Sequence, residues 1–529
     1  MTPSQVAIAP MVVALATAIL ALLVRGAPRL QKGVSLVGIL GYAVAVGALI
    51  RSVYPATILT YQLGGWPAPF GITIVADPLS GFMLGLTAAV AVPALVFSLV
   101  NVDEFGQQVS YHPLFHFMLV GVTGSFLTGD IFNLFVWFEV MLMASYVLVV
   151  FYSGPEQTRA ALQYVVLNLV GSAVMLLSIG GIYATVGTLN MADLARRLAD
   201  PAAYGFDPAP VLGLSALLFA VFALKAGIVP FQFWVPGAYR AAPAPVSAML
   251  AGVVKKVGVY AIVRLYFEVF AAATLPVSLP GIGGHSVLAF YGPVLFVMAT
   301  SSIVFGGISA IARDDLDDLL AYSSIGQVGF IVLPLAIAAT IPDLRSLAIV
   351  AVLIYALNHA LAKGLLFLVA GTIRSGAGST DLHTVSGLST VSPLLAGTFL
   401  VGGLALVGIP PLSGFFAKLL VFQTALGGVN TVPLGVALLG AVFTIAYVSR
   451  AWNRGFWGER SPAVEEFQPD TVELAVLALL ALGIVAVGIG FDPVLHLARA
   501  ASDAALARGA YIDAVDLHTV EAATGGGHP

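Results

Sequence analysis

The feature that most constrains this chain is a series of apolar segments, each about 20 residues long, that recurs from one end of the sequence to the other. A segment of that length, wound as a helix, crosses the hydrocarbon core of a bilayer. The sequence therefore predicts an all-α polytopic membrane protein, in which an even number of spans leaves both ends on one side. We count fourteen segments, near residues 5–25, 33–51, 78–100, 112–128, 130–151, 161–186, 211–236, 244–266, 288–311, 319–340, 345–372, 393–426, 432–452 and 472–492.

Composition supports a lipid environment and excludes several functional classes. Hydrophobic residues make up 59% of the chain and charged residues 9%, whereas roughly a quarter of a soluble domain is charged. The chain has no cysteine, which excludes disulfides, cysteine-ligated iron–sulfur clusters and thiol catalysis. We find no glycine-rich dinucleotide motif, P-loop, HExxH motif or basic run. We therefore expect no cofactor, no bound metal and no nucleic-acid partner.

Two segments, the seventh and the twelfth, are interrupted by glycine and proline. They contain "KAGIVPFQFWVPGAY" and "LVGIPPLSGFFAKLL", which lie five segments apart, and an odd offset inverts the topology. The pattern is typical of an inverted repeat, although two proline-broken helices can also resemble each other by coincidence. We predict three N-terminal helices over residues 1–110, a first repeat over 111–270, a second, inverted repeat over 285–455, and a last helix with a tail over 470–529.

Lysine and arginine are distributed differently along the chain. The arginines, Arg264 included, fall in predicted loops or at helix ends, and of the six lysines only Lys32 is in a predicted loop. Each charged lysine at the centre of a span costs roughly 2.5–3.5 kcal/mol, so the buried ones must be paired, neutral or hydrated. Lysine can lose its proton when it is desolvated, whereas arginine cannot. The lysines within predicted spans are Lys225, Lys255, Lys256, Lys363 and Lys418.

One carboxylate, Glu139, lies near the centre of a predicted span. The helix break at Gly227 and Pro230 frees backbone polar groups, which are tolerated in a membrane only where protein or water satisfies them. Lys225 lies one turn before that break. We hypothesise that a shift of the broken helix changes the distance from Lys225 to Glu139 and so moves a proton.

The remaining polar groups predict a row of side chains through the membrane. His359 and Lys363 are four residues apart and share one helix face. Lys255 and Lys256 are adjacent and diverge by about 100°, so at most one of them faces the row squarely. We expect Lys255 to be a snorkelling or subunit-interface lysine. The hydroxyls and amide of "LAYSSIGQ" either line the row or only pack helices together.

Six motifs resemble the antiporter-like membrane subunits shared by Mrp-type cation/proton antiporters and respiratory complex I. "YATVGTLNMADLA" and "ARGAYIDAV" also resemble the D-subunit branch of the Mrp antiporters. The similarity covers residues 110–430 in motifs, and the helix count extends it over most of the chain. The six motifs are "GDIFNLFVWFEVMLMASYVL", "ALKAGIVPFQFWVPGAY", "VKKVGVYAIVRLY", "DDLDDLLAYSSIGQVGF", "NHALAKGLLFLVAG" and "GIPPLSGFFAKLLVF".

The resemblance implies specific roles for six residues. Glu139 would pair with Lys225, and Lys256 would be the lysine of the eighth helix, with Lys255 as an extra. His359 and Lys363 would bridge toward a terminal lysine on the twelfth helix, here Lys418.

The resemblance also implies a function. The chain would be the proton-translocating subunit of a multi-subunit Na⁺/H⁺ antiporter in the prokaryotic cell membrane, with partner subunits, lipid, H⁺ and Na⁺ as its contacts and both termini extracytoplasmic. The resemblance favours a secondary transporter, and under the redox alternative the chain would be a subunit of an oxidoreductase without redox centres of its own. The alternatives are a proton-pumping subunit of a redox complex, either complex I-like NADH:quinone oxidoreductase or membrane-bound hydrogenase, and a structural scaffold within such a complex.

Overall fold

The computed structural model describes residues 2–103, 110–274 and 286–517 and is almost wholly helical. Its α-helices are α1 (Pro3–Leu23), α2 (Pro28–Val53), α3 (Pro78–Asn101), α5 (Tyr111–Leu127), α6 (Ile131–Val149), α7 (Pro155–Val186), α8 (Met191–Ala199), α9 (Ala209–Ala226), α10 (Trp234–Ala241), α11 (Ala244–Met249), α12 (Lys255–Ala261), α13 (Val287–Ile311), α14 (Leu316–Thr340), α15 (Arg345–Ala377), α16 (Leu388–Val391), α17 (Pro393–Val407), α18 (Ser413–Leu426), α19 (Val432–Ala451), α20 (Thr471–Ile489), α21 (Phe491–Leu506) and α22 (Arg508–Val515).

Shorter elements complete the described chain. Strands β1 (Leu59–Gln62) and β2 (Thr73–Ala76) form an antiparallel hairpin in which Leu59 pairs with Ala76. Three π-helical stretches are η3 (Leu250–Val254), η4 (Ile262–Val269) and η7 (Trp452–Phe456). The 3-10 turns are η1 (Leu63–Gly65), η2 (Pro201–Tyr204), η5 (Phe270–Ala272), η6 (Pro342–Leu344) and η8 (Pro462–Val464).

The helices confirm the predicted membrane architecture. Within the described residues, twelve helices are long and apolar enough to span a bilayer. The shorter α5 and the pair α17–α18 occupy the two remaining predicted segments. Aspartates begin several spans, because a carboxylate satisfies the unpaired N–H groups of a first helical turn. These N-caps are Asp77, Asp130, Asp315 and Asp470.

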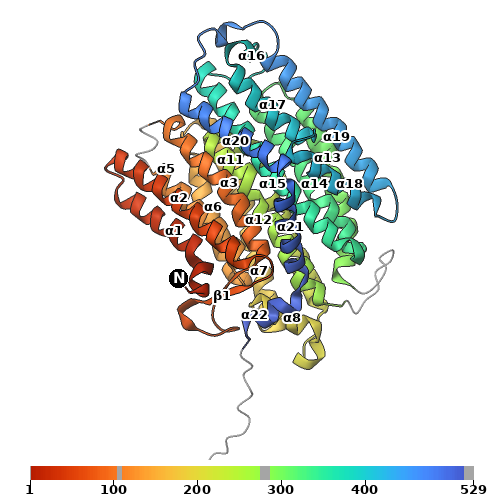
Figure 1. Cartoon of the computed structure of the whole chain (residues 1–529). Helices are drawn as coiled ribbons and strands as arrows, with labels where there is room; N and C mark the ends of the chain where they lie inside the picture. The colour runs from red at the N-terminus through yellow and green to blue at the C-terminus, as the bar shows by residue number, and fades with distance from the viewer. Residues whose placement is uncertain (1, 104–109, 275–285, 518–529) are drawn as a thin grey trace, which may run out of the picture.

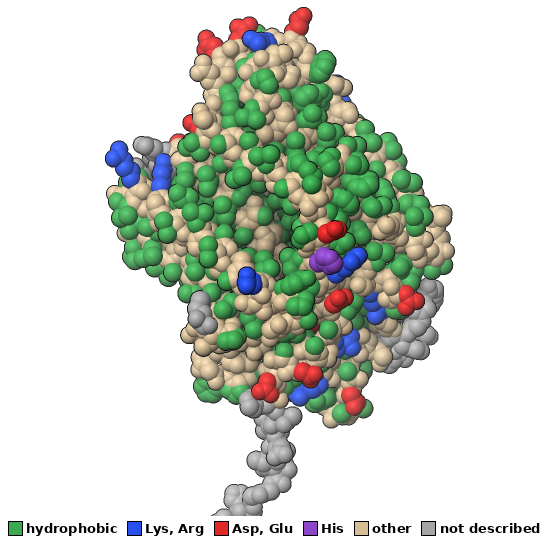
Figure 2. Space-filling model, in the orientation of Figure 1, with side chains coloured by type: hydrophobic (Ala, Val, Ile, Leu, Met, Phe, Trp, Pro, Cys, Tyr) green, Lys and Arg blue, Asp and Glu red, His purple; other side chains and the backbone are tan. Residues whose placement is uncertain are grey.

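The spans form one bundle with α1 and α2 at one side, α13, α14, α18 and α19 at the other, and α3, α11, α12 and α15 between them (Figure 1). The first helix begins, and α22 lies, at the lower end of this view. Figure 2 shows apolar side chains over most of the middle of the same face, with charged side chains toward its upper edge and in its lower half. The exposed apolar middle is the surface expected to face lipid.

Two spans are broken, as the sequence predicted. α9 ends at Ala226, Gly227 adopts a left-handed conformation with φ of 68°, and α10 resumes at Trp234. α17 ends at Val407, Gly408 has φ of 90°, and α18 resumes at Ser413. Glycine populates this region without the steric cost that a Cβ brings, so each break is located by its glycine.

Candidate functional site

The five lysines that the sequence placed within spans are all buried, with at most 5% of any residue exposed. They lie on α9, α12, α15 and α18, of which α12, α15 and α18 follow one another from left to right in Figure 1. Burying five amines without partners would cost a large part of a protein's stability. The contacts of each amine therefore decide what the row can do.

Lys225 is the penultimate residue of α9, beside the first break. Its Nζ donates to the hydroxyl of Tyr164 at 3.1 Å and lies 5.5 and 5.6 Å from the ring centroids of Tyr164 and Trp234. The Tyr164 hydroxyl also lies 3.1 Å from Ser145 Oγ. An aromatic box with one hydroxyl thus holds this amine, and Tyr164 is a contact that the sequence analysis did not identify.

Glu139 and Lys225, expected to pair, are not in contact. Among the described residues they form no ion pair within 4.0 Å, and Glu139 instead accepts a hydrogen bond from Ser172. Glu139 is half-buried. Ser172 and Tyr164 both lie on α7, eight residues and therefore about 12 Å apart along the helix. In this state α7 carries the separate partners of the two groups.

Lys256 and His359 form the closest contact of the row. Lys256 Nζ lies 2.5 Å from His359 Nδ1 and donates to the carbonyl of Ala251 at 2.6 Å. That carbonyl belongs to the π-helical turn η3, whose i→i+5 hydrogen bonds change the direction of the backbone carbonyls relative to an α-helix. π-turns of this kind are frequent at functional sites, and residue periodicity did not reveal this one.

Lys255 is fully buried, which corrects the expectation of a snorkelling or interface lysine. Its Nζ donates to both the carbonyl and the hydroxyl of Ser324 at 3.2 Å. The Ser324 hydroxyl lies 3.3 Å from His359 Nε2. Both adjacent lysines therefore reach the same histidine, one directly and one through a serine. The expectation that at most one could face the row was wrong because a long side chain spans the divergence.

Close packing of α12 against α9 brings these lysines to the first break. A Cβ added at Gly258 would lie 2.4 Å from the carbonyl oxygen of Phe222 and 2.8 Å from the amide nitrogen of Ala226. Only glycine permits that approach of two backbones. Lys255, three residues earlier on the same helix, is thereby placed beside Gly227.

Lys363 continues the row on α15, one turn after His359. Its Nζ donates to the hydroxyl of Ser323 at 2.5 Å and to the carbonyl of Leu320 at 2.8 Å. The serines of "LAYSSIGQ" thus each contact a lysine, which favours the lining interpretation over simple helix packing. His359 and Lys363 share the helix face that the sequence predicted, and that face meets α14.

Lys418 stands apart from the other lysines. Among the described residues its Nζ has no hydrogen-bond partner, and it lies 5.3 Å from the ring centroid of Phe330. A Cβ added at Gly408 would lie 3.0 Å from Lys418 Cδ, so the lysine stem crosses the second break. Asn358 fastens that break, since its amide donates to the Ala405 carbonyl at 3.3 Å and its oxygen accepts from Ser413 Oγ at 2.8 Å.

A neutral polar network lies between Lys363 and the second break. Gln327 donates to the hydroxyls of Tyr447 at 2.8 Å and Thr444 at 3.1 Å and accepts from Tyr355 at 2.6 Å. Tyr355 stacks on Phe330, the ring that faces Lys418. The amide of "LAYSSIGQ" was the only part of this network that the sequence indicated.

Comparison with known proteins identifies the family of this chain. The sequence matches the NADH:quinone oxidoreductase/Mrp antiporter transmembrane family over residues 128–444, which include the six predicted site residues. The chain belongs to this family.

Relatives extend the match over nearly the whole chain. The D-subunit of the Na(+)/H(+) antiporter of Alkalihalophilus pseudofirmus is 35% identical over 90% of this chain and 93% of its own length. The NADH-quinone oxidoreductase subunit N of Desulforudis audaxviator is 34% identical over 92% of this chain and 95% of its own. A chain in the Mrp complex structure from Dietzia sp. DQ12-45-1b is 26% identical and superposes with a TM-score of 0.85, covering 97% of this chain and 100% of that one.

A second charged cluster in this family member escaped the sequence analysis. Arg264, expected at a helix end, is 2% exposed within η4 and forms ion pairs with Asp77 at 2.7 Å and with Glu268 at 2.5 Å. Tyr260 accepts a hydrogen bond from the same guanidinium at 3.1 Å. Tyr260, Arg264 and Glu268 are spaced four residues apart on one helix, but the sequence gave no signal for Asp77, which lies 187 residues from Arg264. These bonds join the cluster to itself rather than to the lysine row, which indicates a structural role.

Outside the membrane-spanning helices, Asp314 contacts two arginines and a histidine. It accepts hydrogen bonds from Arg450 and Arg454 and lies 3.3 Å from His383 Nε2. The hydrogen bond from Arg450 and the nearby positive charges lower the pKa of Asp314 below its ordinary value. This cluster connects the α13–α14 loop to the end of α19.

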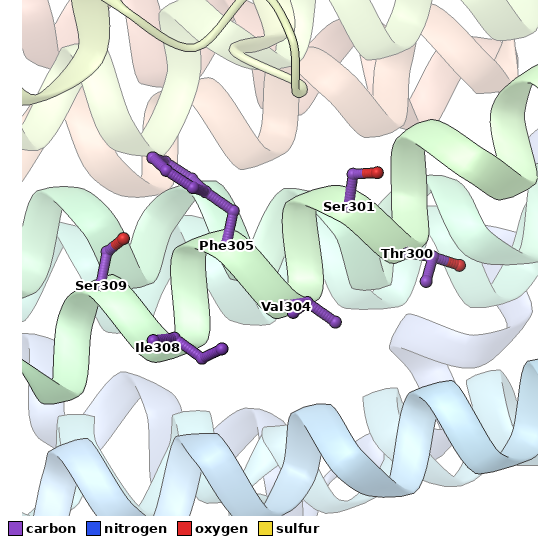
Figure 3. Close-up of a pocket in the computed structure, with 6 residues that line it drawn as sticks. All are labelled: Thr300, Ser301, Val304, Phe305, Ile308 and Ser309. Carbon is purple, nitrogen blue, oxygen red and sulfur yellow. The ribbon is translucent and has the colours of Figure 1, made fainter.

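The surface hollow on α13 does not include the lysine row. A hollow of about 500 Å³ runs along α13 and is lined by residues of that one helix, among them Ser301 and Ser309 (Figure 3). Its lining contains no charged side chain. Within the described ranges, no group of three or more His, Asp or Glu residues could hold a metal ion. The lysine row is thus the candidate site.

Proposed function

We propose that this chain is the proton-translocating subunit of a multi-subunit Na⁺/H⁺ antiporter in a prokaryotic cell membrane, with both termini extracytoplasmic. The observation that carries the proposal is the buried row of amines and imidazole, hydrogen-bonded from Lys255 through His359 to Lys256. Groups that can both gain and lose a proton are the ones a transfer path needs. The relative named as an antiporter D-subunit supports the choice of antiporter.

The proposed mechanism moves a proton without covalent chemistry. A proton on Lys225 is held while Glu139 is near and is released when the broken helix moves the two apart. It passes to Lys256 and His359, then to Lys363, and leaves through Lys418. The two breaks supply the conformational freedom, in the manner of discontinuous helices that lie between repeats. In this proposal residues 111–270 and 285–455 are two repeats of inverted topology, each with one of the breaks.

Partner subunits complete the proposed site at its Glu139 end. Glu139 is half-buried on a helix whose neighbours Phe132, Met143 and Val147 are exposed and apolar. A carboxylate that opens toward lipid is costly. We infer that a neighbouring subunit covers Glu139 in the assembled complex.

A second candidate function is a proton-pumping subunit of a redox complex. The relative named NADH-quinone oxidoreductase subunit N, which matches 92% of this chain, favours it. The same residues would then carry protons, with electron transfer in other subunits as the energy source.

The test measures ΔpH in everted vesicles from antiporter-deficient cells that express this chain with its neighbouring genes. Addition of Na⁺ after a proton gradient has formed should collapse the gradient, and Lys225→Ala should reduce that rate at least about a hundredfold. Lys32→Ala is the matched control. Lys32 is the fifth residue of α2, not a loop residue, and its Nζ donates to the Leu99 carbonyl at 3.1 Å, outside the row. Near-normal exchange by Lys225→Ala would sink the relay. A gradient that forms only with an electron donor would favour the redox function.

A further inference from the structure

Lys255 is the one buried lysine of the row to which the proposed mechanism gives no task. It is wholly enclosed by protein, so neither lipid headgroups nor a partner subunit reaches it in this structure. Its two hydrogen bonds both go to Ser324, on α14. Burying an amine lowers the stability of a protein unless hydrogen-bond or charged partners offset the loss of hydration, and such residues are usually functional.

On one side, Lys255 meets the first break. A Cβ added at Gly227 would lie 3.7 Å from Lys255 Nζ, so the amine lies beside the backbone where α9 ends. The amine also lies 5.9 Å from the ring centroid of Tyr239, and that ring packs edge-to-face on Trp234 at 6.0 Å. Trp234 is one wall of the box around Lys225. Lys255 is therefore linked to the surroundings of Lys225 through the packed rings of Tyr239 and Trp234.

On the other side, Lys255 leads to the histidine. The Ser324 hydroxyl accepts from Lys255 at 3.2 Å and lies 3.3 Å from His359 Nε2. The other ring nitrogen, Nδ1, lies 2.5 Å from Lys256 Nζ. A hydroxyl and an imidazole each donate and accept at once, so these four groups form an uninterrupted chain of exchangeable protons.

We propose that Lys255 and Ser324 form the proton-transfer step that joins the break between α9 and α10 to His359. An N–H bond of protonated Lys255 breaks as its proton goes to Ser324 Oγ, and the hydroxyl's own proton passes to His359 Nε2. The Nδ1 proton of His359 passes to the lone pair of neutral Lys256. One positive charge moves from Lys255 to Lys256, and no bond other than N–H and O–H changes.

This inference rests on the proposed function and is tested in the same vesicles with the complete complex. Lys255→Met keeps the length of the side chain but cannot carry a proton, and Lys255→Arg keeps the charge but cannot release a proton. Both should lower the initial rate of Na⁺-driven gradient collapse at least about tenfold. Ser324→Ala should lower the rate, whereas Ser324→Thr, which keeps the hydroxyl, should retain it. Lys32→Met and Ser301→Ala serve as controls outside the row.

The outcomes separate this step from the relay as a whole. Inactive Lys225→Ala with near-normal Lys255→Met keeps the proposed function and overturns the Lys255 step. Near-normal Lys255→Arg also overturns it, because a fixed charge would then suffice. Active Lys225→Ala overturns the relay and this step together. If Lys255→Met fails to assemble on a native gel, Ser324→Ala decides: a rate equal to that of Ser301→Ala overturns the proposal.

Discussion

The two broken helices solve the same backbone problem with different partners. At the first break, the Leu224 carbonyl accepts from Trp234 Nε1 at 2.7 Å, so the segment fastens itself. At the second break, the Ala405 carbonyl accepts from Asn358, which belongs to α15. The first break is thus held partly from within and partly by α13 and α7, since Ser302 accepts from the Val229 N–H at 2.9 Å and Gln163 donates to the Phe233 carbonyl at 3.0 Å. The second is held by the helix that carries His359 and Lys363.

The lysines at the two breaks also differ in their partners. Lys225 has a hydroxyl partner and two aromatic walls, whereas Lys418 has only the face of Phe330 among the described residues. A hydrogen bond stabilises a buried amine in its position. A buried amine without a hydrogen bond lacks that stabilisation and can pass its proton to a water molecule or another acceptor that reaches it. The contrast indicates that the first break is the holding end of the proposed relay and the second its releasing end.

The strongest test of that contrast is Lys418→Met. Exchange should fall at least about tenfold, because the terminal proton carrier is lost. The purified complex should nevertheless become more stable, by about 1–3 kcal/mol, since an unpartnered buried amine is replaced by an apolar side chain. Thermal unfolding in detergent and the vesicle assay measure the two effects. A less stable Lys418→Met complex would show that the amine has a partner and would remove the contrast.

The next test unfastens the breaks. Asn358→Leu leaves the Ala405 carbonyl and the Ser413 hydroxyl without their partner, which should cost about 1–3 kcal/mol for each. Trp234→Phe removes only the bond to the half-buried Leu224 and should cost about 1 kcal/mol. Exchange should fall more in Asn358→Leu, because that break is tied to α15. Equal losses of stability and exchange in the two variants would contradict the comparison.

Glycine replacements act on the breaks themselves. Gly227→Ala and Gly408→Ala each place a Cβ in the left-handed region, at about 1–2 kcal/mol. The first should be the more damaging, because its Cβ meets Val235 Cγ2 at 2.7 Å, whereas the second meets the lysine stem at 3.0 Å and the Gly414 carbonyl oxygen at 3.2 Å. Gly213→Ala and Gly397→Ala, in α9 and α17 with open space around them, should not destabilise the complex. Denaturation midpoints of the four variants test this order.

The smallest effect is expected outside the membrane, at Asp314→Asn. The lowered folded-state pKa of Asp314 means that its carboxylate stabilises the fold above its unfolded pKa of about 3.9, and that this is lost as pH falls through the lower folded value. The substitution should slightly lower the thermal midpoint at neutral pH and low salt, less at high salt. Exchange should be unchanged. A large loss of exchange would connect this loop to the second break.

The sequence predicted the architecture well because lipid imposes length and hydropathy on every span. It also predicted the two breaks and placed five lysines within spans, although it expected Lys255 to reach an interface rather than to be buried. It could not predict partners such as Tyr164, Ser172 or Asn358, because hydroxyls and amides in a helix have no periodic signature. It missed Arg264 with Asp77 for a similar reason, since 187 residues separate them along the chain. The prediction for Lys255 was wrong because its long side chain reaches the row in spite of the angle of about 100° between adjacent residues of a helix.

The helix over Ala244–Ala272 has a consequence for biogenesis. It carries Lys255, Lys256, Arg264 and Glu268, yet every residue of its most apolar stretch is buried by other parts of the chain. Some of the helices that bury it, α15 and α21 among them, are synthesised later. In a chain that ends near residue 270 those later helices are missing, so this span lacks part of its protein cover and exposes ionisable groups to lipid or to the insertion machinery. Its stable integration must therefore await the second half of the protein, and we expect chains truncated there to be recognised as unfinished and degraded.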